Sequence, residues 1–420
     1  MAVSALISKI LGLLRNNLFL NIFPEEKDII FAAFRIPDFF YYLFVGATIS
    51  IIFIPRAQNL NKEDLKKFFS SFFWSVFVLF GGIMLLGIIF SSFLVKIFAG
   101  GFDIALQKKA IQLSWFLFCS VFILSLSSVF AAFLQKKHKF LSLALAPIFY
   151  TGGICVGLFF LQNSFGLFTV GLSAVFGACL HLIINTISFF LHHGQIGFFW
   201  KKPKKLWSNF AGDFWRRVSN NAMFQINQSA DVLIASFLIA GSVTAFSLGS
   251  ELGHILMSIV GLSVANAAFP KFANKNNCKK SQNKILKKSV FWILFFTLPA
   301  AIFGGIFSEK IIQFLYPTLD GKNLFMTVSV FFWTVISLPM GCLCPVFSRI
   351  FLANNDTKTP LKITTFTLGF STILAAILSL KIFSAEKAIL GLALGNFCAN
   401  TLNALFFFFV LKYKFFGNKK

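Results

Sequence analysis

The feature that most constrains the fold is a series of long apolar runs that covers nearly the whole chain of 420 residues. An α-helix needs about 20 apolar residues to cross ~30 Å of hydrocarbon. Twelve runs of this kind lie near residues 4–22, 28–55, 69–95, 110–135, 140–161, 166–191, 218–240, 242–270, 289–308, 324–353, 361–380 and 388–411. They are too long for barrel strands and do not alternate polar with apolar residues. The pattern predicts an all-α polytopic membrane protein with twelve transmembrane helices.

Composition excludes a soluble enzyme and favours a membrane. The chain is 57% hydrophobic and 12% charged, whereas a soluble domain is typically about 25% charged. Its mean hydropathy is +0.80. The core of a soluble 47.0 kDa protein could not bury that much apolar surface. A net charge of +24 often indicates nucleic acid binding. In so apolar a chain we expect anionic membrane lipids as partners instead, and no nucleic acid.

The basic residues predict the orientation of the helices. Of 38 Lys and Arg, 26 fall in the even-numbered connections and the C-terminal tail, 8 in the odd-numbered connections and four inside the apolar runs. Cytoplasmic loops carry an excess of Lys and Arg. Both termini are therefore predicted to be cytoplasmic. A missed or extra helix in the middle of the chain would destroy this alternation.

The connection at residues 194–217 is predicted to divide the chain. It combines three tryptophans with six basic residues, which is typical of an amphipathic segment at a membrane interface. It separates an N-terminal six-helix lobe, residues 1–193, from a C-terminal six-helix lobe, residues 218–411. Residues 412–420 are predicted to form a basic cytoplasmic tail.

The two lobes share a sequence pattern. Val45-Gly46, Pro55-Arg56 and Asn59 recur as Val260-Gly261, Pro270-Lys271 and Asn274, each 215 residues further on. Because six helices return the chain to the same side, both lobes would have the same orientation. This predicts a parallel pseudo-two-fold repeat, with two lobes around a central cavity.

Charged residues inside the apolar runs are candidates for function. The basic ones are Lys9, Arg15, Arg35 and Arg349, and the acidic ones are Asp28, Asp38, Asp231 and Glu251. Each costs roughly 2.5–3.5 kcal/mol at the bilayer centre, so each should face a cavity or a partner.

Two interpretations of the first helices remain open. Asp28 and Asp38 lie close to the helical face of Arg35 and could neutralise it in a structural network. Alternatively, Lys9, Arg15 and Arg35 line a water-filled cavity and bind an anionic headgroup, since guanidinium groups match phosphate oxygens. Lys9 and Arg15 lie about 120° apart around their helix, so the second interpretation requires a broad cavity.

Other polar and helix-breaking residues suggest bends and a second site. Pro37 and Gly46 are the predicted bending points of the run at 28–55, and Pro339 lies in a run that should also be broken. The start of the helix near 218 is unusually polar, as a cavity wall or a cation site would be. No nucleotide-binding, metalloprotease or nucleophile motif is present, so an enzyme is not expected.

Four segments resemble one family. They are SKILGLLRN (8–16), FAAFRIPDFFYYLF (31–44), IASFLIAGSV (234–243) and FLANNDTKTPLKI (351–363). In this order they resemble the MurJ/MviN family of bacterial lipid II flippases, part of the multidrug/oligosaccharidyl-lipid/polysaccharide exporter (MOP) superfamily. The resemblance extends from residue 8 to about 410.

The resemblance implies a function and assigns roles to residues. It implies that the protein moves lipid II, the undecaprenyl-diphosphate-linked peptidoglycan precursor, from the inner to the outer leaflet of the bacterial inner membrane by alternating access. No cofactor is expected, and the membrane potential or a cation gradient would drive transport. Contacts with the cell-wall synthesis machinery are also expected. The resemblance matches Arg15, Asp28, Arg35, Asp231 and Arg349 to family positions. From the residues and the resemblance together, the predicted roles are diphosphate binding for Lys9, Arg15 and Arg35, a cavity network or gating for Asp28, Asp38, Glu251 and Arg349, and a cation site for Asp231; no metal centre is expected.

Several positions depart from the family pattern. Lys9 stands where the family usually has Arg, Asn16 where it has Asp, and Tyr41 where it has Arg. Ser250-Glu251 replaces an Asp-Arg pair, which reverses the charge offered to a diphosphate. The family's last two helices, which are thought to form the groove for the lipid tail, are expected to be missing.

These departures keep two alternatives open. The run at 361–380 has no Asn or Asp to complete a sodium site around Asp231. A related exporter could carry another polyprenyl-linked glycan or a cationic drug, for which Glu251 would be suited. A scaffold of the cell-wall machinery that transports nothing would also tolerate the lost arginines.

Overall fold

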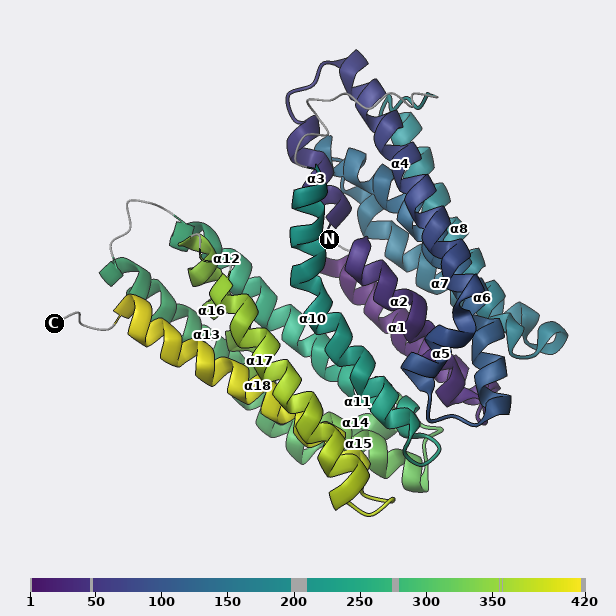
Figure 1. Cartoon of the computed structure of the whole chain (residues 1–420), viewed down its shortest axis with the longest axis vertical. Coiled ribbons are helices and arrows are strands. Elements are labelled where there is room, and N and C mark those ends of the chain that lie inside the picture. Colours follow the sequence, from purple (N-terminus) through teal and green to yellow (C-terminus); the bar gives the residue numbers. More distant parts are fainter. Residues whose placement is uncertain are drawn as a thin grey trace. The chain divides into compact units, whose positions relative to one another are not determined.

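Helices make up all the regular structure in the part of the chain that the structure describes (Figure 1). The computed structural model describes residues 2–45, 48–197, 210–273, 279–354, 356 and 358–416. A helix satisfies its backbone hydrogen bonds within one segment, which hydrocarbon requires. The predicted all-α membrane class is confirmed.

The chain forms two compact units, Met1–Ser229 and Ala230–Lys420. Their boundary falls inside α10 (Phe210–Ser236), which begins eight residues before the predicted start of that helix. Of the predicted amphipathic segment 194–217, residues 198–209 lie outside the described residues. Its last part, residues 210–217, belongs to α10, so that the helix includes polar residues which hydropathy alone had assigned to a connection.

Unit 1 is built around one long, buried helix. Its other elements are α1 (Ala2–Ile22), α2 (Lys27–Phe44), α3 (Thr48–Ala57), α4 (Lys62–Ile89), α5 (Ser91–Ala99), α7 (Leu141–Phe165) and α8 (Phe168–Leu191), with the first part of α10. The central helix is α6 (Ile104–Lys136), which contacts α2, α3, α4, α5 and α8. Phenylalanines fill the core beside it, and the rings of Phe69 and Phe189 stack with centroids 4.6 Å apart.

Unit 2 repeats this helical construction. Its elements are α11 (Ser242–Met257), η1 (Ser258–Leu262), α12 (Ser263–Ala273), α13 (Lys279–Ile306), α14 (Ser308–Leu315), α15 (Gly321–Ile336), α16 (Leu338–Ala353), α17 (Lys358–Ile377), η2 (Leu378–Ile382), α18 (Ile389–Leu411) and η3 (Lys412–Phe416), where η marks a π-helical turn. The core lies where α16 packs against α12, α13 and α18, with Phe347, Phe351 and Phe407 buried there.

All twelve predicted apolar runs coincide with helices. Among the described residues, nine helices are long and apolar enough to cross a membrane, and the bent pair α15–α16 makes a tenth. The other two predicted spans, near 4–22 and 218–240, form α1 and α10, which carry several of the polar candidates. The count of twelve spans stays a prediction.

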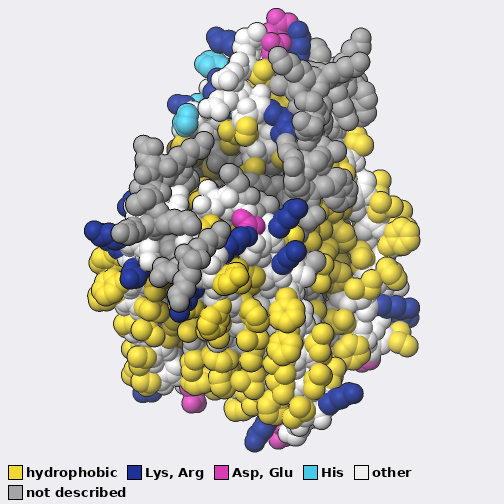
Figure 2. Space-filling model, turned by 60° about the vertical axis from the view of Figure 1, so that its left-hand side comes forward, with side chains coloured by type: hydrophobic (Ala, Val, Ile, Leu, Met, Phe, Trp, Pro, Cys, Tyr) yellow, Lys and Arg dark blue, Asp and Glu magenta, His cyan; other side chains and the backbone are white. Residues whose placement is uncertain are grey.

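The surface matches a hydrocarbon environment. Large apolar side chains remain exposed, among them Phe160 at 73% and Phe314 at 84%. In the lower part of Figure 2, hydrophobic side chains cover the surface almost continuously, and Lys and Arg lie around the edges of this region. Such an apolar band between polar edges is typical of a lipid-facing surface.

The internal repeat extends to element boundaries. The starts of α2 and α11 are 215 residues apart, and so are the starts of α3 and α12. In unit 2 the first helix of the pair continues into the π-helical turn η1, and in unit 1 Val45 forms a turn after α2, with residues 46–47 outside the described residues. Further along, α7 and the α17–η2 pair have equal lengths and are 217 residues apart. The structure therefore supports the repeat that the five residue pairs predicted.

The predicted bends have different outcomes. α15 and α16 meet at 47° around Ser337, two residues before Pro339, which confirms the predicted break in 324–353. α2, in contrast, continues through Pro37 to Phe44. Gly46, the other predicted bending point, lies outside the described residues.

Candidate functional site

The structure places five of the eight predicted site residues in unit 1 and three in unit 2. Lys9 and Arg15 lie in α1, and Asp28, Arg35 and Asp38 lie in α2. Asp231 lies in α10, Glu251 in α11 and Arg349 in α16. The two groups occupy different units, so each is described separately.

Arg35 is anchored to α10. Its Nη2 donates hydrogen bonds to Oε1 of Gln225 at 2.9 Å and to the carbonyl oxygen of Gln225 at 3.1 Å. Its Nε donates to Oγ of Ser229 at 3.3 Å. Gln225 and Ser229 are one helical turn apart, and both are buried. Arg35 therefore fastens α2 to α10, and the polar start of this helix supplies partners that the analysis of nearby acids did not include.

Arg15 has a different environment. Its Nε and Nη2 donate to Oδ1 of the fully buried Asn16 at 3.2 and 2.9 Å. Its guanidinium carbon lies 5.7 Å from the ring centre of Phe19 and 5.9 Å from that of Phe34, within cation–π range. Within the described part of the chain, Arg15 forms no salt bridge. Asn16, Phe19 and Phe34 are neutral, so the charge of Arg15 remains able to attract an anion.

Tyr150 of α7 connects Arg15 to the acid of α2. The Tyr150 side chain interacts electrostatically with both Arg15 and Asp38. Tyr41 interacts with Asp38 in the same way. The sequence analysis missed Tyr150, although a tyrosine within an apolar run was an available signal.

The outer candidates of unit 1 lie nearer to the helix ends. Lys9 is exposed and forms no hydrogen bond or ion pair within the described residues. It is six residues from Arg15, which corresponds to about 9 Å along the helix axis. Asp28 lies in the first turn of α2, where a negative charge is favourable at a helix N-terminus. Lys9 and Arg15 thus occupy separate positions along α1.

In unit 2, Arg349 connects two helices. Its Nη2 donates to Oδ1 of Asn266 on α12 at 3.0 Å, and its guanidinium lies 5.1 Å from the ring centre of Phe269. Glu251 is partly buried in α11. The contacts of Arg349 tie α16 to α12.

Asp231 is the most buried of the charged candidates, at 3% exposure. Nδ2 of Asn396 on α18 lies 3.5 Å from its Oδ2. One turn further along α18, Asn400 donates to Oγ of Ser337 at 3.0 Å. The run at 361–380 contains no amide partner for Asp231, and the structure supplies one from the following helix, α18. Carboxylate and amide oxygens are ligands that hard cations prefer.

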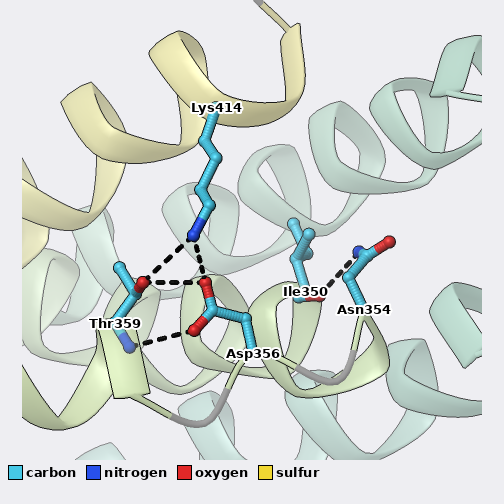
Figure 3. Close-up of polar contacts among 5 residues, drawn as sticks. All are labelled: Ile350, Asn354, Asp356, Thr359 and Lys414. Atoms are coloured by element: carbon cyan, nitrogen blue, oxygen red, sulfur yellow. Dashed lines mark hydrogen bonds and ion pairs between the residues drawn. The ribbon is translucent and has the colours of Figure 1, made fainter.

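Asp356, within the NDTKTP segment, forms hydrogen bonds with Thr359 and an ion pair with Lys414 (Figure 3). Asp356 accepts hydrogen bonds from the backbone nitrogen of Thr359 at 3.0 Å and from its Oγ1 at 2.7 Å. Nζ of Lys414, in η3, donates to the same carboxylate at 2.5 Å. Asp356 thus caps α17 and holds the end of α18 against this turn. Partial burial alone would raise the pKa of Asp356, but these donors lower it to about 2.

Asp356→Ala is expected to destabilise unit 2 by about 1–2 kcal/mol at neutral pH, because it removes both the cap and the ion pair. The folded-state pKa lies below the ordinary value of 3.8. The stabilisation is therefore complete above about pH 4 and is lost as the pH falls towards 2. Thermal unfolding in detergent at a series of pH values measures the effect.

Glu386→Ala provides the control for this prediction. Glu386 pairs with Lys322, and both side chains are 73% exposed, so the variant should unfold like the wild type. Equal destabilisation by both variants, or a difference between wild type and Asp356→Ala that persists at pH 2, would contradict the role of Asp356.

Curated relatives match the chain along most of its length. The protein described as probable lipid II flippase MurJ from Helicobacter pylori strain J99 is 27% identical over 418 residues, which cover 93% of this chain and 88% of the relative. The protein of the same description from Thermotoga maritima is 25% identical, with 92% of this chain and 78% of the relative covered.

Solved structures have the same fold. The structure titled lipid II flippase MurJ, inward closed conformation, superposes with a TM-score of 0.82 at 23% identity, covering 98% of this chain and 87% of that one. An inward-facing MATE family transporter of the MOP superfamily gives 0.77 at 12% identity, with 98% and 96% covered. The family model described as lipid II flippase MurJ matches residues 26–420. The chain therefore belongs to the MurJ family.

Proposed function

We propose that this protein flips lipid II from the inner to the outer leaflet of the bacterial inner membrane. The observation that carries the proposal is Arg15, a partly buried cation in a membrane helix whose hydrogen-bond acceptor is a neutral amide, in a chain of the MurJ family. A guanidinium can bind a diphosphate through two parallel hydrogen bonds. The protein is a transporter in this proposal, and its residues bind the substrate without changing it chemically.

Alternating access would use the interruptions of the helices. The π-turn η1 and the bend between α15 and α16 are places where a helix can change direction. Arg35, by contrast, holds α2 to α10 through its hydrogen bonds to Gln225 and Ser229. We assign binding to Arg15, positioning of α2 to Arg35, and attraction of the headgroup to the exposed Lys9.

The coupling site would be Asp231. A carboxylate with 3% exposure next to the amide of Asn396 can accept a monovalent cation or a proton. Asp231→Asn keeps the shape and removes the charge, so transport should become insensitive to an imposed cation gradient. Transport measured with and without a sodium or proton gradient tests this, with Asp320→Asn as the control for a distant acid. A retained gradient response in Asp231→Asn would contradict the assignment.

The membrane orientation is a separate proposal. The positive-inside distribution favours cytoplasmic N- and C-termini. A cysteine attached after the C-terminal residue should react with an impermeant thiol reagent only in inverted vesicles, measured in a variant without the native cysteines. Anionic lipids, and contacts with the cell-wall synthesis machinery, would complete the set of partners.

Reconstitution tests the function directly. Vesicles that contain the purified protein and fluorescent lipid II should expose inner-leaflet lipid II to an external quencher faster than protein-free vesicles. Polyprenyl diphosphates with other glycans should move more slowly. Lipid II movement equal to that in empty vesicles would contradict the proposal. Faster movement of another glycan lipid, or of a cationic drug that Glu251 could attract, would instead support a related exporter.

A further inference from the structure

A groove in unit 2 has no role in the proposed transport. It lies between α13, α16 and the C-terminal end of α18 and has a volume of about 650 Å³. This is within the range of roughly 300–1,000 Å³ that is typical of small-molecule sites. All the residues that line it belong to unit 2, and all but three are apolar.

The groove has a closed floor and an open side. Leu286, Phe347 and Leu411 are buried in its floor and belong to the core of the unit. On the open side, Phe291 is 59% exposed and Phe408 is 49% exposed. Because these side chains lie in helices apolar enough to span a membrane, the open side faces hydrocarbon.

The polar lining is confined to one end. Asn283 and Lys287 lie in the first turns of α13, and Lys412 directly follows the last residue of α18. Both lysines are exposed, and no acidic residue lines the groove. By the charge distribution of the chain, this end is the cytoplasmic one. The groove is thus apolar along its length and cationic at the membrane surface.

We propose that this groove binds an anionic glycerophospholipid of the cytoplasmic leaflet. An acyl chain lies between α13, α16 and α18, and the phosphate lies between the ammonium groups of Lys287 and Lys412. A neutral lipid would leave the two cations without a counter-charge. A helix of another protein would cover the floor equally well but would gain nothing from two lysines unless it were acidic. The positive charge at the cytoplasmic end of the groove therefore favours an anionic lipid over a neutral lipid and over a helix of another protein.

Photo-labelling of the full chain tests the proposal. The protein is placed in phosphatidylcholine nanodiscs with a trace of diazirine-acyl phosphatidylglycerol or diazirine-acyl phosphatidylcholine, and the adducts are mapped by mass spectrometry. Phosphatidylglycerol should label the peptides of α13, α16 and α18 more strongly, by about fivefold for each lysine that contacts the phosphate. The combined variant Lys287→Gln and Lys412→Gln should lose this preference.

The chain offers a matched control. Lys284 and Lys288 are exposed on the same helix but do not line the groove, so Lys284→Gln with Lys288→Gln removes the same charge and should retain the preference. As a second test, Leu405→Trp fills the groove from its 40% exposed wall and should reduce labelling by both lipids.

Three results would overturn the proposal. They are equal labelling by the two lipids in the wild type, an equal loss of preference in the control variant, and displacement of phosphatidylglycerol by polyprenyl phosphate at the same concentration. Glycerol phosphate should not compete, because it lacks the chain that fills the groove. Each of these readouts is independent of lipid II transport.

Discussion

Gly177→Val is expected to prevent unit 1 from reaching its native packing. A Cβ on Gly177 would collide with the backbone carbonyl oxygen of Tyr150, and a Cβ on Gly153 would lie 2.7 Å from Cα of Gly177. The backbones of α7 and α8 therefore approach each other at these two glycines, as small residues allow in membrane helices. Neither backbone can move without displacing its helix, so we expect a loss of about 3 kcal/mol or more. The yield of monodisperse protein and its thermal unfolding measure the effect.

Gly82→Val is the matched control. Gly82 also lies within a helix of unit 1, α4, but a Cβ there would have no heavy atom within 4 Å. This variant should be produced and should unfold like the wild type. If Gly177→Val were equally well behaved, the close crossing of α7 and α8 would not be required for folding.

The crossing at Gly177 also bears on the candidate site. Tyr150, whose carbonyl oxygen marks the point of closest approach, is the residue whose side chain interacts with Arg15 and Asp38. A milder substitution, Gly177→Ala, should therefore displace Tyr150 and weaken headgroup binding before it prevents folding. The same part of α7 therefore contributes both to the packing against α8 and to the candidate site around Arg15.

The fold was largely predictable because the membrane allows few solutions. A run of about 20 apolar residues must become a helix in hydrocarbon, and all twelve runs did so. The repeat was visible at five residue pairs, and in the structure α2 and α3 begin 215 residues before α11 and α12. The bend near Pro339 could also be predicted from the sequence, because a proline within a helix removes a backbone hydrogen bond.

The partners of the candidate residues were less predictable. The sequence left open whether acids on the same helix neutralise Arg35, and the structure adds a partner from another helix, since the Arg35 guanidinium donates to Gln225, 190 residues away. The contact of Asp231 with Asn396 spans 165 residues, and that of Lys414 with Asp356 spans 58. Spacing along one helix defines a face, but the neighbour of that face depends on how helices pack. The π-helical turns likewise had no sequence signal in the hydropathy pattern.

Arg15→Ala is expected to reduce lipid II translocation by about 10- to 100-fold. The substitution removes a charged donor to the diphosphate, and such hydrogen bonds contribute about 1.5–3 kcal/mol. Folding should be preserved, because Arg15 forms no salt bridge within the described residues and lies partly exposed over Phe19 and Phe34. Initial rates in reconstituted vesicles and rescue of cells depleted of their lipid II flippase both measure the effect.

Two further variants distinguish specific binding of the diphosphate by Arg15 from a general effect of positive charge on transport. Arg15→Lys keeps the charge but not the paired donors, so its rate should fall between those of the wild type and Arg15→Ala. Lys108→Ala removes an exposed charge from the first turns of α6 and should transport normally. Equal rescue by wild type and Arg15→Ala would remove Arg15 from the binding site. Lys9 would then be the remaining cation of α1, and Arg35→Ala would be expected to lower stability through lost contacts with α10 rather than substrate affinity alone.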